Sequence, residues 1–191
     1  MEIPDEELCD RVAAGDGAAF DLLVERHRGR AHRLAWSIVR NAEDARDLSQ
    51  EAFIRLYRTA GSFKGRARFS TWFFRIVVNL CLDHLRRDRW WRRMLAGPPE
   101  RARGHDDGPS AIERVAAPDA GVDANLARSE TMTALWSAVD RLSPQQRASV
   151  LLQIEGLATS EIAGVLDCSE ATVRVHLHRA LTSLRATLGG R

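Results

Sequence analysis

Three carboxylates within residues 41–58 could share one face of a helix and bind either metal ions or a basic partner. Asp44, Asp47 and Glu51 stand at i, i+3 and i+7, which is one row on an α-helix. Clustered carboxylates of this kind hold pairs of divalent cations in helical bundles, but those sites also need Glu-x-x-His motifs on neighbouring helices. The sequence contains no such motif. Metal chemistry is therefore disfavoured, and a solvated face or a docking face remains.

No other catalytic signature accompanies these carboxylates. The sequence has no glycine-rich phosphate-binding loop, no nucleophile elbow and no Cys/His cluster with metal-ligand spacing. Cys9, Cys81 and Cys168 are too scattered for a disulfide framework and suit a reducing compartment. We expect no enzymatic activity, no cofactor and no metal. A metal-dependent hydrolase that uses the three carboxylates is the least favoured hypothesis.

Arginine and tryptophan gather on the next predicted helix, which should run from residue 70 to about residue 93. One face of it carries a row of side chains spaced by three or four residues: Trp72, Arg75, Asn79, Asp83 and Arg86. The stretch "HLRRDRWWRR", residues 84–93, then interleaves arginines with two tryptophans. Binding to single-stranded or melting DNA requires rings that stack on bases and arginines that track phosphates. The alternative is a basic, solvated helix end.

A helix-turn-helix is predicted near the C-terminus. Ser143-Pro144 with Gln146 forms a capping box at the start of one helix, and Gly156 ends that helix. A short helix over 160–166, a turn over 167–169 and a longer helix from Glu170 complete the arrangement.

The outer face of the last helix has the composition of a DNA-recognition surface. Its side chains are those that a recognition helix offers to a major groove: Arg174, Val175, His178 and Arg179. The arginines could fork onto guanine or hold phosphates. An ordinary solvated helical hairpin is the alternative.

The elements that must position these residues are all helices. Strand signals are nearly absent, and helical periodicity predicts an all-α fold, in which an N-terminal helical bundle is joined by a flexible linker to a C-terminal helix-turn-helix domain. We expect the first domain at 5–93, a proline- and glycine-rich linker at 94–127 and the second domain at 128–188. Ser70 is the expected N-cap of the arginine- and tryptophan-rich helix.

The charge composition and the N-terminal sequence bear on the binding partner and on the cellular location. The chain has 27 arginines and a single lysine among 191 residues, a bias that suits nucleic acid but also follows from GC-rich codon usage. The N-terminus is acidic and lacks the apolar segment of a signal peptide, and no apolar stretch reaches the ~18 residues that cross a membrane. We expect a cytoplasmic protein without membrane insertion.

Taken together, these motifs resemble those of a bacterial sigma factor of the extracytoplasmic-function (ECF) type, in the sigma-70 family. "EDARDLSQEAFIRLY" resembles the polymerase-binding helix of that family, and "FSTWFFRIVVNLCLDHLRR" resembles its promoter-melting helix. "LSPQQRASVLL" and "SEIAGVLDCSEATVRVHLHRAL" resemble its C-terminal helix-turn-helix. The resemblance covers about residues 5–93 and 128–188 and leaves only the linker unmatched. It implies a sigma region 2 domain followed by a sigma region 4 domain.

The resemblance also implies partners and roles. The chain would bind core RNA polymerase, at the β′ clamp helices and the β subunit, and would direct promoter-specific initiation. The residues that would bind polymerase are Asp44, Asp47, Leu48, Gln50, Glu51 and Phe53. Those that would contact and melt the −10 element are Trp72, Arg75, Asn79, Asp83, Arg86 and Arg87, and those that would read the −35 element are Arg174, Val175, His178 and Arg179. An anti-sigma factor is a further implied partner.

Two positions depart from the family pattern, and one other function competes. Arg46 stands where the family is often acidic, and Asp167 stands where glycine is common. The roles of Trp90 and Trp91 do not follow from the resemblance. The competing hypothesis is a stand-alone helix-turn-helix transcriptional regulator, with the first domain serving for ligand binding or dimerisation.

Overall fold

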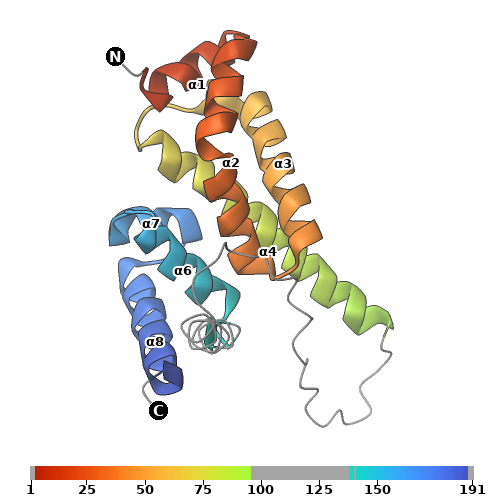
Figure 1. The fold of residues 1–191 in the computed structure, drawn as a ribbon, viewed down its shortest axis with the longest axis vertical. Helices are drawn as coiled ribbons and strands as arrows, with labels where there is room; N and C mark the ends of the chain where they lie inside the picture. The colour runs from red at the N-terminus through yellow and green to blue at the C-terminus, as the bar shows by residue number, and fades with distance from the viewer. Residues whose placement is uncertain (1–2, 96–137, 140, 189–191) are drawn as a thin grey trace, which may run out of the picture.

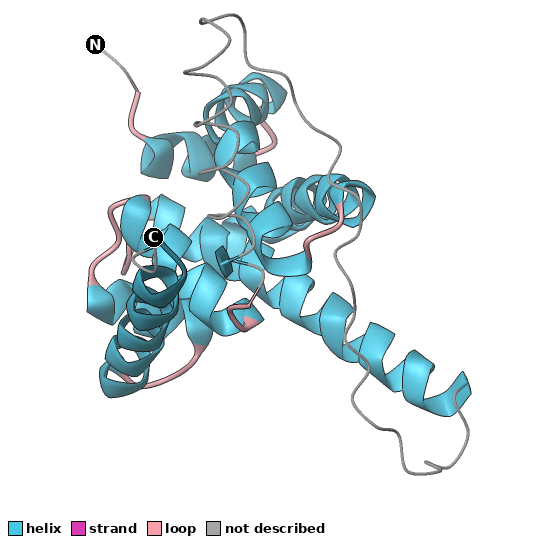
Figure 2. Cartoon of the chain, turned by 60° about the horizontal axis from the view of Figure 1, so that its bottom comes forward, coloured by secondary structure: helices cyan, strands magenta, loops and turns pink. Residues whose placement is uncertain are grey.

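The computed structural model describes residues 3–95, 138–139 and 141–188, and every regular element within these ranges is a helix (Figure 2). The predicted all-α fold is therefore confirmed. The helices of the first domain are α1 (Asp5–Ala13), α2 (Gly17–Val39), α3 (Ala42–Thr59), the 3-10 turn η1 (Ala60–Ser62) and α4 (Phe69–Leu95). Those of the second domain are α6 (Pro144–Ile154), α7 (Thr159–Leu166) and α8 (Glu170–Leu188). The predicted linker, 94–127, lies outside the described residues except for 94–95, which continue α4.

Helix α2 is the centre of the first domain, since α1, α3 and α4 all pack against it (Figure 1). Its buried face repeats every three or four residues and includes Leu23, Leu34 and Ile38. The apolar row that the sequence predicts on α3 is buried in full: Ala45, Leu48, Ala52 and Leu56. One continuous core therefore fixes which faces of α3 and α4 point to solvent.

An aromatic cluster joins α4 to this core. Phe69 and Phe73 are fully buried, and their rings stack with centroids 5.9 Å apart. Phe53 of α3 meets Phe73 at 4.9 Å. The buried imidazole of His27 lies against both phenylalanines of α4 and binds the Asp5 carboxylate through Nε2 at 2.7 Å. Burial lowers the pKa of His27, although the Asp5 carboxylate acts in the opposite direction.

The start of α4 differs from the prediction. The helix begins at Phe69 rather than after Ser70, and the backbone N–H of Phe69 donates to the Glu6 carboxylate at 2.9 Å. A carboxylate at this position satisfies a free helix donor and complements the helix dipole. Ser70 was the wrong cap because the group that satisfies the helix end comes from α1, 63 residues away in sequence.

The second domain has the predicted helix-turn-helix geometry. Ser143 and Gln146 form the capping box of α6, and Gly156 has a φ of +88° after its end. Asp167 ends α7 in the left-handed region with φ of +52°, which Asp tolerates better than most residues. The backbone N–H of Thr172 donates to Ser169 Oγ at 3.1 Å, as expected of the N-cap of α8.

The two domains pack on each other. Helix α6 contacts α2, and α7 contacts α4 (Figure 1). Glu155, at the end of α6, accepts from Arg30 Nε at 2.5 Å and from Arg33 at 3.1 Å. Arg147 of α6 donates to the backbone carbonyl of Ile38 at 2.9 Å.

A hydroxyl and a carboxylate also join the two domains. Thr71 of α4 is buried, and its hydroxyl donates to the Glu161 carboxylate of α7 at 2.9 Å. The described residues thus form a closed arrangement, in which the helix-turn-helix covers the N-terminal part of α4.

Glu155→Ala should open this arrangement. The carboxylate is only 12% exposed and binds two arginines, of which Arg33 is 60% exposed. Its loss should cost the interface on the order of 1–2 kcal/mol. The expected result in small-angle X-ray scattering is a larger radius of gyration for the variant. Glu170→Ala removes a Glu–Arg pair within α8 and is the matched control. An unchanged radius in both variants would contradict the role of Glu155.

A fall in pH should also open the closed arrangement of the two domains. Burial tends to raise the pKa of Glu155, but the hydrogen bonds from Arg30 and Arg33 outweigh it, so the pKa is lowered. The interface therefore keeps its stability above the ordinary carboxyl pKa and loses it as the pH falls through the lowered value. The radius of gyration of the wild type should rise over that acid range, and Glu155→Ala should lack this contribution.

Candidate nucleic-acid and protein interfaces

The predicted docking face of α3 is exposed and polar. Asp47, Gln50 and Glu51 are exposed and lie on one side of the helix. Asp44 is half-exposed, and its Oδ2 lies 3.3 Å from Nε2 of His84 on α4. The structure therefore brings three of the four predicted polar residues together in solvent, while the fourth is partly engaged by the neighbouring helix.

The two predicted apolar polymerase contacts are buried. Leu48 and Phe53 are each 8% exposed and belong to the core, so they support the exposed face of α3 from beneath. Two other residues supply exposed apolar area on this helix: Ile54, 45% exposed, and Tyr57, 51% exposed. Ile54 does not belong to the buried apolar row of α3. An apolar residue outside that row is the signal in the sequence that could have identified Ile54 as an exposed contact residue.

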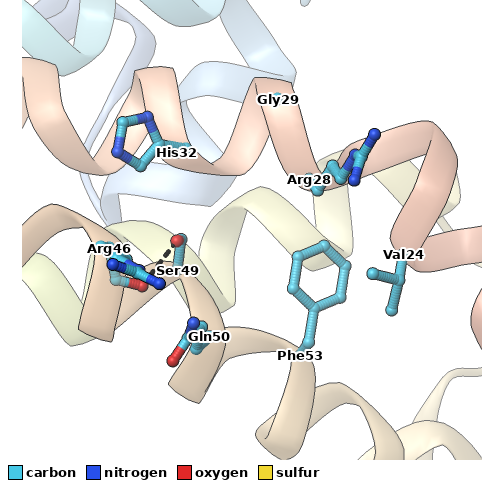
Figure 3. A pocket seen from close by; sticks show the side chains of 8 residues that line it. All are labelled: Val24, Arg28, Gly29, His32, Arg46, Ser49, Gln50 and Phe53. Carbon is cyan, nitrogen blue, oxygen red and sulfur yellow. Dashed lines mark hydrogen bonds between the residues drawn. The ribbon is translucent and has the colours of Figure 1, made fainter.

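A shallow groove of about 470 Å³ runs between α2 and α3 beside the docking face (Figure 3). Figure 3 shows Arg28 and His32 of α2 on one side and Arg46 with Gln50 of α3 on the other. Phe53 lines the groove too. The face of α3 is therefore mixed: its acids are flanked by a cationic groove that could receive an acidic side chain of a partner.

The predicted DNA face of α4 is exposed over most of its length. Arg75, Asn79, Asp83, Arg86 and Arg87 are exposed, and Asp83 binds Arg86 at 3.1 Å. Trp72 differs from these, because it is half-buried and packs on Phe63 with ring centroids 5.3 Å apart. Only part of its indole is therefore available to a ligand.

The acidic face of α3 and the basic face of α4 meet at a second groove. It has a volume of about 510 Å³ and is lined by residues of both helices, which include Glu51, Arg55, Asp83, Arg86 and Arg87. Leu48 and Leu80 supply its apolar lining. Two surfaces of opposite charge, each predicted to bind a different partner, are therefore neighbours.

The helix-turn-helix reaches the start of the α4 face. Oδ1 of Asp167, in its turn, lies 3.9 Å from an Arg75 guanidinium nitrogen. Together with the Thr71–Glu161 hydrogen bond, this places α7 over the first turns of α4. A ligand of Arg75 would have to compete with Asp167 in this arrangement.

The predicted recognition face of α8 points to solvent and does not pack against the core. Arg174, Val175, His178 and Arg179 are all exposed, whereas Val173 and Ala180 on the other side are buried. Arg174 pairs with Glu170 of the same helix at 2.9 Å. The structure therefore brings the four predicted residues onto one solvent-facing surface.

The cysteines are not activated. Burial raises the pKa of Cys9 to about 11 and that of Cys81 to about 12. Burial also raises the pKa of Cys168. Among the described residues no three His, Cys, Asp or Glu side chains are grouped so that they could hold a metal ion. The described helices also include none whose length and apolar character would let it cross a bilayer.

Comparison with known families matches both domains. Residues 23–92 match the family described as Sigma-70 region 2, and residues 132–184 match Sigma-70, region 4. The first match contains α3 and most of α4, and the second contains the helix-turn-helix. The order of the two regions along the chain is the one that the sequence motifs predict.

Individual relatives match nearly the whole chain. The ECF RNA polymerase sigma factor SigM of Mycobacterium tuberculosis is 38% identical over 189 residues, which is 98% of this chain and 86% of SigM. The RNA polymerase sigma-H factor of Pseudomonas aeruginosa is 32% identical, over 96% of this chain and 93% of its own.

Solved structures share the fold. CnrH, in complex with the cytosolic domain of CnrY, has a TM-score of 0.64 at 25% identity, over 97% of each chain. RpoE of Bartonella quintana, solved in complex with the anti-sigma factor NepR, has a TM-score of 0.63 at 19% identity. It covers 90% of this chain and 97% of its own, and it shows likeness of fold alone.

Proposed function

The chain belongs to the ECF group of the sigma-70 family, and from this membership we propose which of its surfaces bind core RNA polymerase and which bind promoter DNA. Asp47, Gln50 and Glu51 dock on the β′ clamp helices, with Asp44 at the edge of the contact. Acidic side chains that face a basic partner speed the encounter and fix how the two surfaces align, more than they add affinity. Ile54 and Tyr57 supply the apolar area that a polymerase contact needs at its centre.

The observation that carries this proposal is the groove between α3 and α4. Glu51 of the docking face and Arg86 and Arg87 of the α4 face line the same groove. A protein bound to α3 and DNA bound to α4 would therefore be held side by side. An initiation factor must present promoter DNA to the polymerase in this way, whereas a metal-dependent hydrolase has no use for two such faces.

The DNA contacts divide between the domains. Asn79 contacts an unstacked base of the −10 element, with Arg75, Asp83, Arg86, Arg87 and the exposed part of Trp72 beside it. The α8 face, from Arg174 to Arg179, enters the major groove at the −35 element. Asp167 faces Arg75 across 3.9 Å, and both side chains are exposed. DNA would therefore compete with Asp167 for Arg75.

An anti-sigma factor is the regulatory partner that we propose, and the cytoplasm is the compartment in which the chain acts. CnrH, the fold neighbour at 25% identity, was solved in complex with another protein, the cytosolic domain of CnrY, and this supports a protein partner for the chain. Partners that occur in the cytoplasm, polymerase and DNA, support the proposed compartment. The chain itself performs no catalytic step in this account.

A stand-alone regulator would not account for all of the exposed charged faces. It would need the α8 face and a ligand-binding or dimerisation site, but not an acidic α3 face beside a basic α4 face. It also predicts sequence-specific DNA binding without polymerase, with a salt slope near ~0.9 per phosphate contacted.

Asp47→Lys with Glu51→Lys should abolish binding to bacterial core polymerase. The two acids are exposed on one side of α3, so reversal of both charges replaces attraction by repulsion without disturbing the core. The expected affinity loss, measured by surface plasmon resonance, is at least ~100-fold, about 1.4 kcal/mol for each tenfold. Asp21→Lys with Glu25→Lys is the matched control, since these are exposed acids with the same spacing on α2. Equal losses in both variants would mean that net charge, not the α3 face, decides binding.

Asn79→Ala and Arg179→Ala should separate the two DNA contacts. Both side chains are exposed, so neither change should alter folding or polymerase binding. Each should lower transcription in vitro by roughly 5- to 150-fold, the loss expected when a base contact of about 1–3 kcal/mol disappears. Asn79→Ala should relax sequence preference only at the −10 element, and Arg179→Ala only at the −35 element. Relaxation at the opposite element in either variant would reverse the assignment.

A further inference from the structure

Two facing rows of side chains line the groove between α2 and α3 and the surface next to it. Residues 40–41 alone connect the two helices, which therefore run antiparallel along each other (Figure 1). The α2 row repeats every four residues, and the α3 row meets it in reverse order along the chain. From one end to the other, the rows are Phe20, Val24, Arg28 and His32 on α2 and Tyr57, Phe53, Gln50 and Arg46 on α3. Figure 3 shows Val24 facing Phe53 and His32 facing Arg46.

The two ends of these rows differ in chemistry. At the apolar end, the exposed ring of Tyr57 meets Phe20 edge to face, with ring centroids 5.2 Å apart. At the cationic end, Arg28, His32 and Arg46 are all exposed. Arg28 and Arg46 form no ion pair within the ranges that the structure describes. Their guanidinium groups can therefore bind a carboxylate without breaking an existing ion pair.

This groove borders the docking face of α3 on the side away from the DNA face. At ~100° per residue, Arg46 and Phe53 point to one side of α3, whereas Glu51 and Arg55, which line the groove toward α4, point to the other. Gln50 belongs both to the docking face and to the groove. A protein bound to α3 can therefore reach α2 directly, while α3 itself separates the groove from DNA bound to α4.

We propose that the polymerase contact extends from α3 across this groove onto α2, so that a segment of polymerase lies along the two rows. That segment places a carboxylate opposite Arg28 and Arg46 and an apolar side chain beside Tyr57. The inference rests on the proposed function, because it extends the contact that we assign to α3. A phosphate group would pair with the arginines but would leave the apolar end without a partner.

Arg46 becomes a specificity residue in this arrangement. It stands where the family is often acidic. The docking face selects positive charge on polymerase, and the groove beside it selects negative charge. Two neighbouring surfaces of opposite sign fix how a partner aligns and penalise a partner whose charges are arranged differently.

The test measures binding of the full chain to core polymerase from the bacterium that encodes it, by surface plasmon resonance without DNA. Arg28→Glu and Arg46→Glu, made singly, should each weaken binding by at least ~10-fold, because each places like charges opposite one another. A polymerase surface that is basic throughout predicts the reverse, since added acid on the chain would tighten binding. Arg28→Lys with Arg46→Lys should keep most of the affinity, because both positive charges remain.

The control and the smaller change make the result specific. Arg66→Glu, an exposed residue in the loop before α4, makes the same change in net charge and should leave the affinity within about twofold of the wild type. Arg28→Ala should weaken binding in the same direction as Arg28→Glu, without a new charge on α2. An equal loss in Arg66→Glu would mean that net charge decides binding, and would overturn the inference. A loss in Arg46→Glu alone would also overturn it, since the contact would then end at α3.

The same measurement separates this inference from the function on which it rests. A wild type that binds polymerase, with Arg28→Glu binding equally well or more tightly, would remove the extension onto α2 and leave the docking face of α3 in place. A wild type that fails to bind polymerase would remove the proposed function itself.

Discussion

The burial of one face of α4 against α2 and α3 determines where the functional side chains of the first domain lie. Phe69, Phe73 and Val77 are fully buried on that face, so the opposite row, from Arg75 to Arg87, must point to solvent. The same packing orients α3, because Phe53 is held against Phe73. Substitution of these core rings would therefore disturb both binding faces at once. Exposed residues such as Asn79 can be changed without moving the scaffold.

The interface between the domains adds a second constraint. Glu155 binds Arg30 and Arg33, and Glu161 binds Thr71, so the helix-turn-helix is held over the N-terminal part of α4. Apolar side chains of the second domain, among them Leu152 and Ile162, also belong to the same buried cluster as the core of the first domain. A partner that separates the domains must therefore outcompete both the polar contacts and this apolar packing. The apparent affinity for DNA is then the affinity of the open form multiplied by the fraction of molecules that are open.

The features that depend on periodicity and capping within a single helix could be predicted from the sequence. The buried row of α3, the capping box at Ser143 and the solvent-facing recognition residues of α8 all follow from spacing along a single helix. Contacts between distant segments could not be predicted in this way. The Glu6 carboxylate at the start of α4 and the Glu155 contact with Arg30 join residues 63 and 125 positions apart. Leu48 and Phe53 stay predicted polymerase contacts; each is 8% exposed, and this burial depends on the packing of α3 against its neighbours, which periodicity along α3 alone does not specify.

Transcription in vitro distinguishes an initiation factor from a stand-alone regulator. Bacterial core polymerase would be incubated with a library of genomic fragments, with and without the chain, and the transcripts would be sequenced. If the chain is an initiation factor, discrete transcripts should appear only when it is present and should share two sequence elements upstream of their start sites. Sequence-specific DNA binding by the chain without transcripts and without association with polymerase would contradict this role, and would favour a stand-alone helix-turn-helix regulator.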